Sequence, residues 1–117
     1  MRYEYEGEMA RAEADLQLAR EQMERLVAQA IGEVNQARNQ LATSTERRQR
    51  LENELLADAE RVAKAAEFAY GKGAIGLIDL LDARRTWRQV QLEAAQARAD
   101  YAKARAAWRM LTAGEKR

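Results

Sequence analysis

The chain has 117 residues, enough for one domain, and its 20 basic and 19 acidic side chains leave a net charge of +1. It contains no Cys and no His, which excludes a disulfide framework and thiol chemistry and removes the commonest general base and metal ligand. The opposite charges are interspersed, whereas a nucleic-acid-binding protein shows a basic face with little acid on it. The carboxylates alternate with Arg and Lys, as on solvated helix faces. We therefore expect a protein that is not an enzyme, with no cofactor, no metal site and no nucleic-acid partner.

Alanine supplies 25 residues and aromatic residues only seven, which suits helices packed along narrow seams better than a thick globular core. There is no Pro, so nothing forces a helix to break. No segment approaches the roughly 20 apolar residues that span a bilayer, and no secretory signal is visible at the N-terminus. We expect either a cytosolic chain or a piece of a larger exported protein.

The first residues allow two interpretations. Residues 2–6 alternate Tyr with charged residues, which is compatible with a strand stub within residues 1–7, and Gly7 interrupts that pattern. From Glu8 onward, apolar residues recur in alternating steps of three and four, the repeat of a coiled-coil seam. This N-terminal seam comprises Met9, Ala12, Leu16, Ala19, Met23, Leu26 and Ala30.

The same periodicity continues towards the middle of the chain after an extra step of four, a stutter, at Val34. It predicts one helix over about 8–70, roughly 95 Å long. Three polar residues interrupt its seam, which is tolerable where one side of the helix is wet. The predicted positions are Ala37, Leu41, Ser44, Arg48, Leu51, Leu55, Asp58, Val62, Ala65 and Ala69.

Three of the six glycines, Gly71, Gly73 and Gly76, lie within six residues. Because Gly adopts positive φ without a steric cost, this cluster predicts a tight reversal over 71–76 and a second helix over about 77–113. Gly114 is expected at the C′ position of that helix, with Lys116 and Arg117 beyond it favourable to the helix dipole. The fold class is therefore all-α: a single long antiparallel coiled-coil hairpin spanning residues 1–117.

The second helix carries an unbroken seam of alternating steps, at Leu80, Ala83, Trp87, Val90, Ala94, Ala97, Tyr101, Ala104, Trp108 and Leu111. A second stripe runs along another face, at Leu92, Ala95, Ala99, Ala102 and Ala106. Two apolar faces favour two neighbours, as in a wall or bundle, although a plain antiparallel four-helix dimer fits the periodicity as well. At about 55 Å the helix is too short to cover residues 8–32, which need another partner.

The turn region reads Tyr70, two residues, Gly73, five residues, Asp79, two residues, then Asp82 and Ala83. This spacing resembles the periplasmic tip of the TolC-type outer-membrane efflux proteins. The following stretch, TWRQVQLEAAQARADYAKARAAWRMLTAG, resembles the family's C-terminal hairpin helix. The stretch YEGEMARAEADL resembles the point where a membrane strand passes into the long helix, and its sequence is most similar to the CzcC-like heavy-metal-efflux branch. The likeness covers one C-terminal repeat of a channel that has two.

The resemblance implies a trimeric channel in the outer membrane, with this segment in the periplasm as part of an α-helical tunnel wall. The implied partners are a periplasmic adaptor (membrane fusion) protein and, indirectly, an inner-membrane pump. Membrane contact would come only through strands that this sequence lacks, so the fragment itself is expected to be soluble. By position, Tyr70, Asp79 and Asp82 match the gate. The adaptor docking turn matches Gly71, Lys72, Gly73, Ala74, Ile75 and Gly76.

Some positions carry a simpler interpretation beside the implied one. An acid at Asp79 is expected in a first helical turn from the macrodipole alone. Ile75 stands where some members carry a gate arginine, and Lys72 where a small apolar residue is common. Arg84 and Arg85 are candidates to pair with the two acids. The alternative function is a stand-alone, self-associating coiled-coil interaction protein without a transport role, and in either case exposed seams predict self-association.

Overall fold

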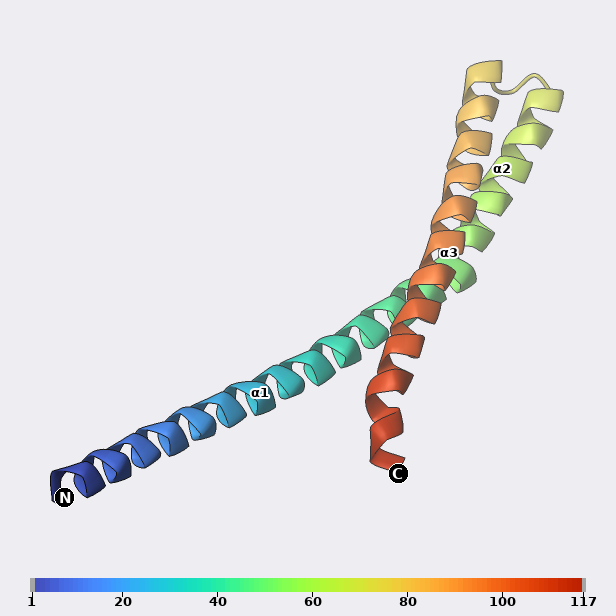
Figure 1. The fold of residues 1–117 in the computed structure, drawn as a ribbon. Helices are drawn as coiled ribbons and strands as arrows, with labels where there is room; N and C mark the ends of the chain where they lie inside the picture. The colour runs from blue at the N-terminus through green and yellow to red at the C-terminus, as the bar shows by residue number, and fades with distance from the viewer. Residues whose placement is uncertain (1, 117) are drawn as a thin grey trace. The chain divides into compact units, whose positions relative to one another are not determined.

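The computed structural model describes residues 2–116, with side chains described for 2–114. In chain order the elements are the helix α1 (Arg2–Arg50), the π-helical turn η1 (Leu51–Leu55), the helices α2 (Leu56–Gly71) and α3 (Leu77–Thr112), and the 3-10 turn η2 (Ala113–Lys116). Helices α2 and α3 run side by side and are joined by a short turn (Figure 1). The described residues contain no strand. The predicted all-α hairpin is confirmed.

The chain divides into two compact units between Gln36 and Ala37. The first unit is the initial part of α1, a single helix in which every described residue is exposed except Glu21 and Val34, which are half-buried. Its apolar side chains stay in solvent: Leu16 is 53% exposed and Met23 is 62% exposed. An amphipathic helix of this kind depends on packing for its stability, so this face is available to a partner.

Residues 2–7 are helical, so the strand stub considered for residues 1–7 is wrong within the described range; Met1 lies outside it. An isolated strand leaves its backbone groups without a neighbour to bond, whereas a helix satisfies them within its own segment. The alternation of tyrosines does not mark one buried face, because Tyr3 is 88% exposed and Tyr5 is 66% exposed.

The core of the second unit is thin and mostly alanine. Two larger side chains complete it, Leu51 and Leu80, and Leu51 packs against Ala94 and Ala97 with Val90 beside them. Small side chains let the two helix backbones approach closely, so little apolar volume seals the hairpin. The buried alanines are Ala37, Ala59, Ala63, Ala94, Ala97 and Ala104.

The α3 side of this core follows a single stripe. Nine of its residues are buried or half-buried: Leu80, Ala83, Trp87, Val90, Ala94, Ala97, Tyr101, Ala104 and Trp108. The tenth, Leu111, is 40% exposed. Two arginines of α1 lie over two of the three aromatic members, with the Arg48 guanidinium 4.6 Å from the Tyr101 ring centre and that of Arg38 5.8 Å from the Trp108 ring centre. Cation–π contact explains how an arginine can occupy a seam position.

The π-helical turn η1 changes the face that α2 buries. Up to Leu51 the buried positions of the outgoing helix are the predicted ones. Beyond it, four predicted positions, Leu55, Asp58, Val62 and Ala65, are wrong by one residue, since all four are exposed, Leu55 at 42% and Val62 at 56%; the last one, Ala69, is half-buried as predicted. A π turn accommodates one extra residue and so rotates the following helix. The residues that are buried or half-buried instead are Leu56, Ala59, Ala63 and Ala66.

The C-terminal end of α3 also differs from expectation. Helix α3 runs into η2 through Ala113, and Gly73 alone among the described residues has a positive φ. Gly114 therefore does not cap the helix in a left-handed conformation, and Arg117 lies outside the described residues. The Ala113 backbone N–H instead donates to the Arg109 carbonyl, which continues the helical hydrogen bonding, and the Thr112 hydroxyl donates to the Trp108 carbonyl over 2.9 Å.

Candidate functional site

The turn at the hairpin tip is closed by a Schellman motif. The Ala74 N–H donates to the Ala69 carbonyl over 2.8 Å, and the Gly73 N–H donates to the Tyr70 carbonyl over 3.0 Å. Between these bonds Gly73 lies at φ 76°, the left-handed conformation that this motif requires. These bonds satisfy the last carbonyls of α2, so the tip has a defined backbone rather than a loose loop.

Only one of the three clustered glycines is needed for its conformation. Gly71 is the last residue of α2, and Gly76 lies in an extended conformation (φ −82°, ψ 167°) at the N-cap of α3, where its carbonyl accepts from Leu80 N–H over 3.3 Å. A Cβ atom at Gly71, Gly73 or Gly76 would meet nothing within 4 Å. The reversal therefore depends on Gly73 through backbone strain, not through space.

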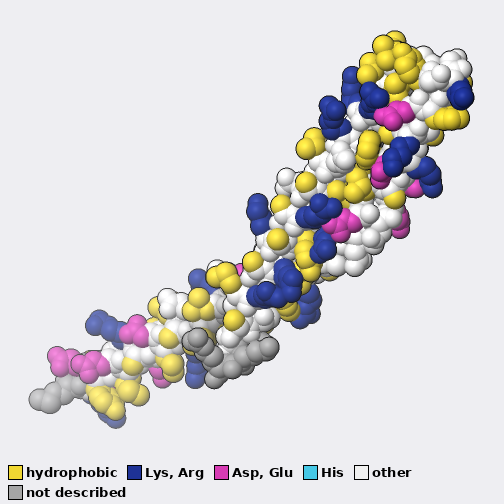
Figure 2. Space-filling model, turned by 90° about the vertical axis from the view of Figure 1, so that its right-hand side faces the viewer, with side chains coloured by type: hydrophobic (Ala, Val, Ile, Leu, Met, Phe, Trp, Pro, Cys, Tyr) yellow, Lys and Arg dark blue, Asp and Glu magenta, His cyan; other side chains and the backbone are white. Residues whose placement is uncertain are grey.

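Apolar side chains are exposed around the turn, as the yellow atoms at the upper end of Figure 2 show. Phe68 is 69% exposed, Leu77 52% and Ile78 76%, and the Lys72 ammonium lies 5.6 Å from the Phe68 ring centre. We call Phe68, Leu77 and Ile78, with Tyr70 at 43% exposure, the apolar tip. Sequence analysis singled out Tyr70 and Lys72 but missed Phe68, Leu77 and Ile78. The sequence signal that could have identified these three residues is that they are apolar and flank the glycine turn.

The two candidate gate acids lie in the first turns of α3. Asp79 and Asp82 are both exposed and three residues apart, which places them on one helix face. Asp82 Oδ1 is 3.9 Å from Arg85 Nη1, a contact at the limit of an ion pair, and Asp79 has no ion pair within the described residues. Neither acid has a packing role in the hairpin.

The expected pairing of Arg84 with the acids is wrong. Its Nε donates across the hairpin to Glu67 Oε1 over 3.1 Å, joining α3 to α2. Sequence analysis missed Glu67 because it lies on the opposite helix, 17 residues away. This ion pair joins the two helices just behind the tip, and of the two arginines only Arg85 lies near a candidate gate acid, Asp82.

A second ion-pair cluster lies at η1, far along the hairpin from the turn. The Glu52 carboxylate accepts from Arg98 of α3 and, over 3.2 Å, from Arg48 of α1, while Arg47 Nη1 is 3.3 Å from Asp100 Oδ2. The hydrogen bond from Arg98 lowers the pKa of the Glu52 carboxyl; partial desolvation opposes this, and Arg48 adds to the lowering. These ion pairs connect α3 with α1 and η1, at the position where the buried face of the outgoing helix changes.

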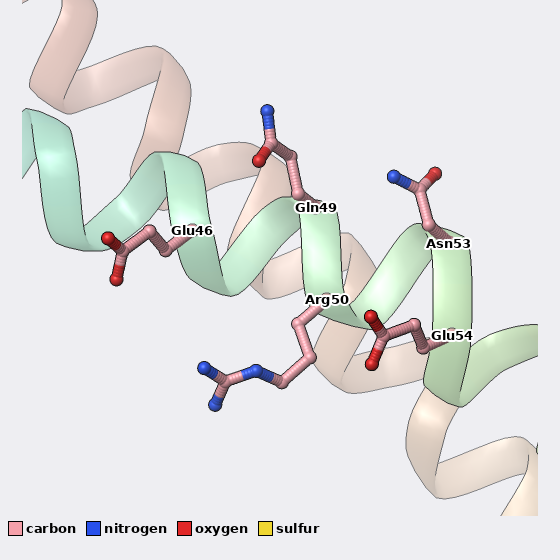
Figure 3. Close-up of a pocket in the computed structure, with 5 residues that line it drawn as sticks. All are labelled: Glu46, Gln49, Arg50, Asn53 and Glu54. Carbon is pink, nitrogen blue, oxygen red and sulfur yellow. The ribbon is translucent and has the colours of Figure 1, made fainter.

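A shallow polar hollow lies on the same stretch of α1 and η1, between exposed side chains of one continuous helical segment (Figure 3). Gln49 and Asn53 project to one side of it, and Glu46, Arg50 and Glu54 project to the other. Among the described side chains, no three His, Cys, Asp or Glu residues are grouped closely enough to hold a metal ion. No helix in the described range is long and apolar enough to cross a membrane.

The fold and tip together define a coiled-coil hairpin protein whose distinctive surface is its turn. The family model for outer membrane efflux proteins matches residues 5–114, and the chain belongs to this family. The resemblance to the TolC-type outer-membrane efflux proteins is therefore confirmed. Members of this family are channels of the outer membrane rather than enzymes. No curated protein and no solved structure gives a significant match to the chain.

Proposed function

We propose that this chain is the periplasmic tip hairpin of a trimeric outer-membrane efflux channel in a tripartite export pump, where it forms the gate and the adaptor docking site. Family membership supports the general efflux role. The observation that carries the finer proposal is the tip itself: a backbone closed by hydrogen bonds that presents exposed apolar and acidic side chains.

The gate proposal rests on the exposure of the two acids. In a trimer, Asp79 and Asp82 of three copies supply six carboxylates around the narrow end of the tunnel. Such a ring favours cations and resists anions. Because neither side chain is buried or engaged in a strong ion pair, both remain available to line a pore. Tyr70, half-exposed on the other side of the turn, is the aromatic member of this constriction.

The docking proposal rests on the apolar tip and the turn that positions it. Exposed large apolar side chains gathered at one end of a helical protein mark a contact surface. The turn between Gly71 and Gly76 holds Lys72, Ala74 and Ile75 in one backbone arrangement. An adaptor hairpin that meets this end would cover Phe68 and Ile78, which are among the most exposed large apolar residues of the second unit.

Capture on an immobilised periplasmic adaptor hairpin from the same organism tests docking. We expect Gly73→Trp to abolish capture, because it strains the left-handed position and places a large ring on the turn. Ile78→Ser should weaken capture without touching the backbone. Gly32→Ala, in α1 and outside the turn, is the matched control, since a Cβ atom there meets nothing within 4 Å. Unchanged capture by both variants, with helicity retained in circular dichroism, would contradict the docking site.

A further inference from the structure

Two neighbouring arginines, Arg84 and Arg85, follow the candidate gate acids in α3, but their charges act in different places. Adjacent residues of a helix project in different directions, since 3.6 residues complete one turn. Arg84 donates across the hairpin to Glu67, whereas Arg85 lies almost one turn beyond Asp82, with its Nη1 atom 3.9 Å from Asp82 Oδ1. Of the two arginines, Arg85 is therefore the one whose charge acts on a gate acid.

Asp79, Asp82 and Arg85 follow one another in steps of three, which keeps them near one face of α3. All three side chains are exposed, and Asp79 forms no ion pair within the described residues. From the turn inward, this face thus carries an unpaired carboxylate, then a carboxylate with a guanidinium beside it. Two negative charges and one positive charge give −1 per chain, so three copies contribute −3 although they supply six carboxylates.

The contact between Arg85 and Asp82 is loose. At 3.9 Å it lies at the limit of an ion pair, and the Arg85 side chain is 82% exposed. An exposed pair of this kind contributes little to the stability of a helix. In a narrow pore with walls of low dielectric constant, the same charge acts more strongly on a passing ion. The guanidinium then competes with cations for the Asp82 carboxylate.

Distance along the helix makes the two acids respond differently to Arg85. Six residues at a rise of 1.5 Å place Arg85 about 9 Å along the helix axis from Asp79. The Debye length in 0.15 M salt is about 8 Å, so the field of Arg85 is largely screened at Asp79. Asp82 is only three residues from Arg85. Arg85 therefore weakens one of the two carboxylate positions and leaves the other at full charge.

We propose that Arg85 limits the cation affinity and selectivity of the gate by offsetting Asp82, so that Asp79 is the stronger of the two cation positions. This inference rests on the proposed gate at Asp79 and Asp82. It adds to that gate a residue that does not attract cations but sets how strongly the gate holds them. A weakened second position favours conduction, since a conducting site must bind an ion and still release it.

Block of the K⁺ current by Mg²⁺ tests this role in the full trimeric channel, recorded in a planar bilayer at about 0.15 M KCl. Mg²⁺ is the probe because it prefers oxygen ligands such as carboxylates. We expect Arg85→Gln to tighten the block roughly threefold to tenfold and to raise the permeability ratio of K⁺ over Cl⁻, because three guanidinium groups leave one constriction. Arg85→Lys keeps the charge and should return the block towards the wild-type value.

Double variants assign the effect to one acid. Arg85→Gln should tighten the block as much in the Asp79→Asn background as in the wild type, but by less than about twofold in the Asp82→Asn background. The matched control is Arg61→Gln on α2, because Arg61 forms an exposed pair of the same spacing with Asp58, over 2.7 Å, outside the turn. This control should leave the block unchanged.

The possible outcomes separate the role of Arg85 from the gate itself. If Asp79→Asn with Asp82→Asn weakens the block while Arg85→Gln leaves it unchanged, the gate stands and the role of Arg85 is overturned. An equal effect of Arg85→Gln with and without Asp82 would also overturn that role, since the arginine would then act as a general positive charge. If neither the acids nor Arg85 alter the block, the gate proposal fails and this inference fails with it.

Discussion

Each of the two units of this chain has an apolar stripe with coiled-coil spacing, but only in the second unit is that stripe covered by another helix. Both contain apolar residues spaced by three and four, yet in residues 37–114 the stripe is buried against a second helix, while in residues 2–36 it is exposed. Leu51 is 4% exposed and Leu16 is 53% exposed. Periodicity therefore predicts the face of a helix that seeks a partner, and the partner decides how much stability that face provides.

The sharpest test of this contrast is truncation of one leucine in each unit. Leu51→Ala should destabilise the hairpin by about 2–4 kcal/mol, because it leaves a cavity against Ala94 and Ala97. Leu18→Ala, at an exposed position outside the seam of the first unit, should change stability by less than about 0.5 kcal/mol. Urea unfolding followed by circular dichroism measures both. Equal losses would show that the two units do not differ as described.

The turn offers a second matched pair, this time between neighbouring glycines. Gly73→Ala should cost about 1–2 kcal/mol, because a Cβ atom at φ 76° is strained even in open space. Gly71→Ala, in the last helical residue of α2, should be neutral or stabilise by up to about 1 kcal/mol. Thermal unfolding of the two variants compares them directly, and a tolerated Gly73→Ala would refute the Schellman assignment.

The π-helical turn η1 yields a prediction that runs against the usual effect of a deletion. Removal of Asn53 should convert η1 into regular α-helix while keeping Leu51 and Ala59 on the buried side, so that stability changes by about 1 kcal/mol or less. Removal of the exposed Arg61, which lies between the buried Ala59 and Ala63, cannot keep both Ala59 and Ala63 on the buried side and should cost considerably more. If thermal unfolding ranks the two deletions the other way, η1 is not the source of the shifted seam.

The Glu52 cluster gives the smallest expected effect, and its sign follows from the pKa. The folded-state pKa of Glu52 lies below its ordinary value of 4.5, so its contribution to stability is present above that value and is lost as the pH falls through the lower, folded-state pKa. Glu52→Gln should therefore lower the melting temperature slightly at pH 7 and flatten the decline in acid. Glu54→Gln is the control, because this exposed carboxylate of the same turn forms no ion pair within the described residues, and it should keep the wild-type melting temperature at pH 7.

The fold could be predicted because its signals are local. Steps of three and four, the absence of proline and the glycine cluster specify two helices and a reversal, and the cluster contains Gly73, the residue with positive φ. The change of buried face at η1 could not be predicted, because neighbouring positions are equally apolar. Leu55 is followed by Leu56, and Val62 is followed by Ala63. An alanine-rich helix offers two acceptable stripes, and only packing against α3 selects between them.

The tip shows where inference from residues ends. The glycine spacing located the site, but the exposure of Phe68, Leu77 and Ile78 emerged only when the helices were assembled. Long-range ion pairs escaped for the same reason, since Arg84 lies beside Asp82 in sequence and bonds Glu67 in space. Sequence neighbours suggest pairs within a helix, whereas the register between two helices determines the pairs that form across the hairpin.

The measurement that bears most directly on the proposed gate is single-channel conductance in a planar bilayer of the full trimeric channel containing this segment. The comparison is between the wild type and Asp79→Asn with Asp82→Asn, and Asp58→Asn, an exposed acid on α2, is the control. If the acids ring the constriction, the double variant loses cation preference and block by multivalent cations, while the control keeps both. Unchanged selectivity and block in the double variant would contradict a gate at Asp79 and Asp82.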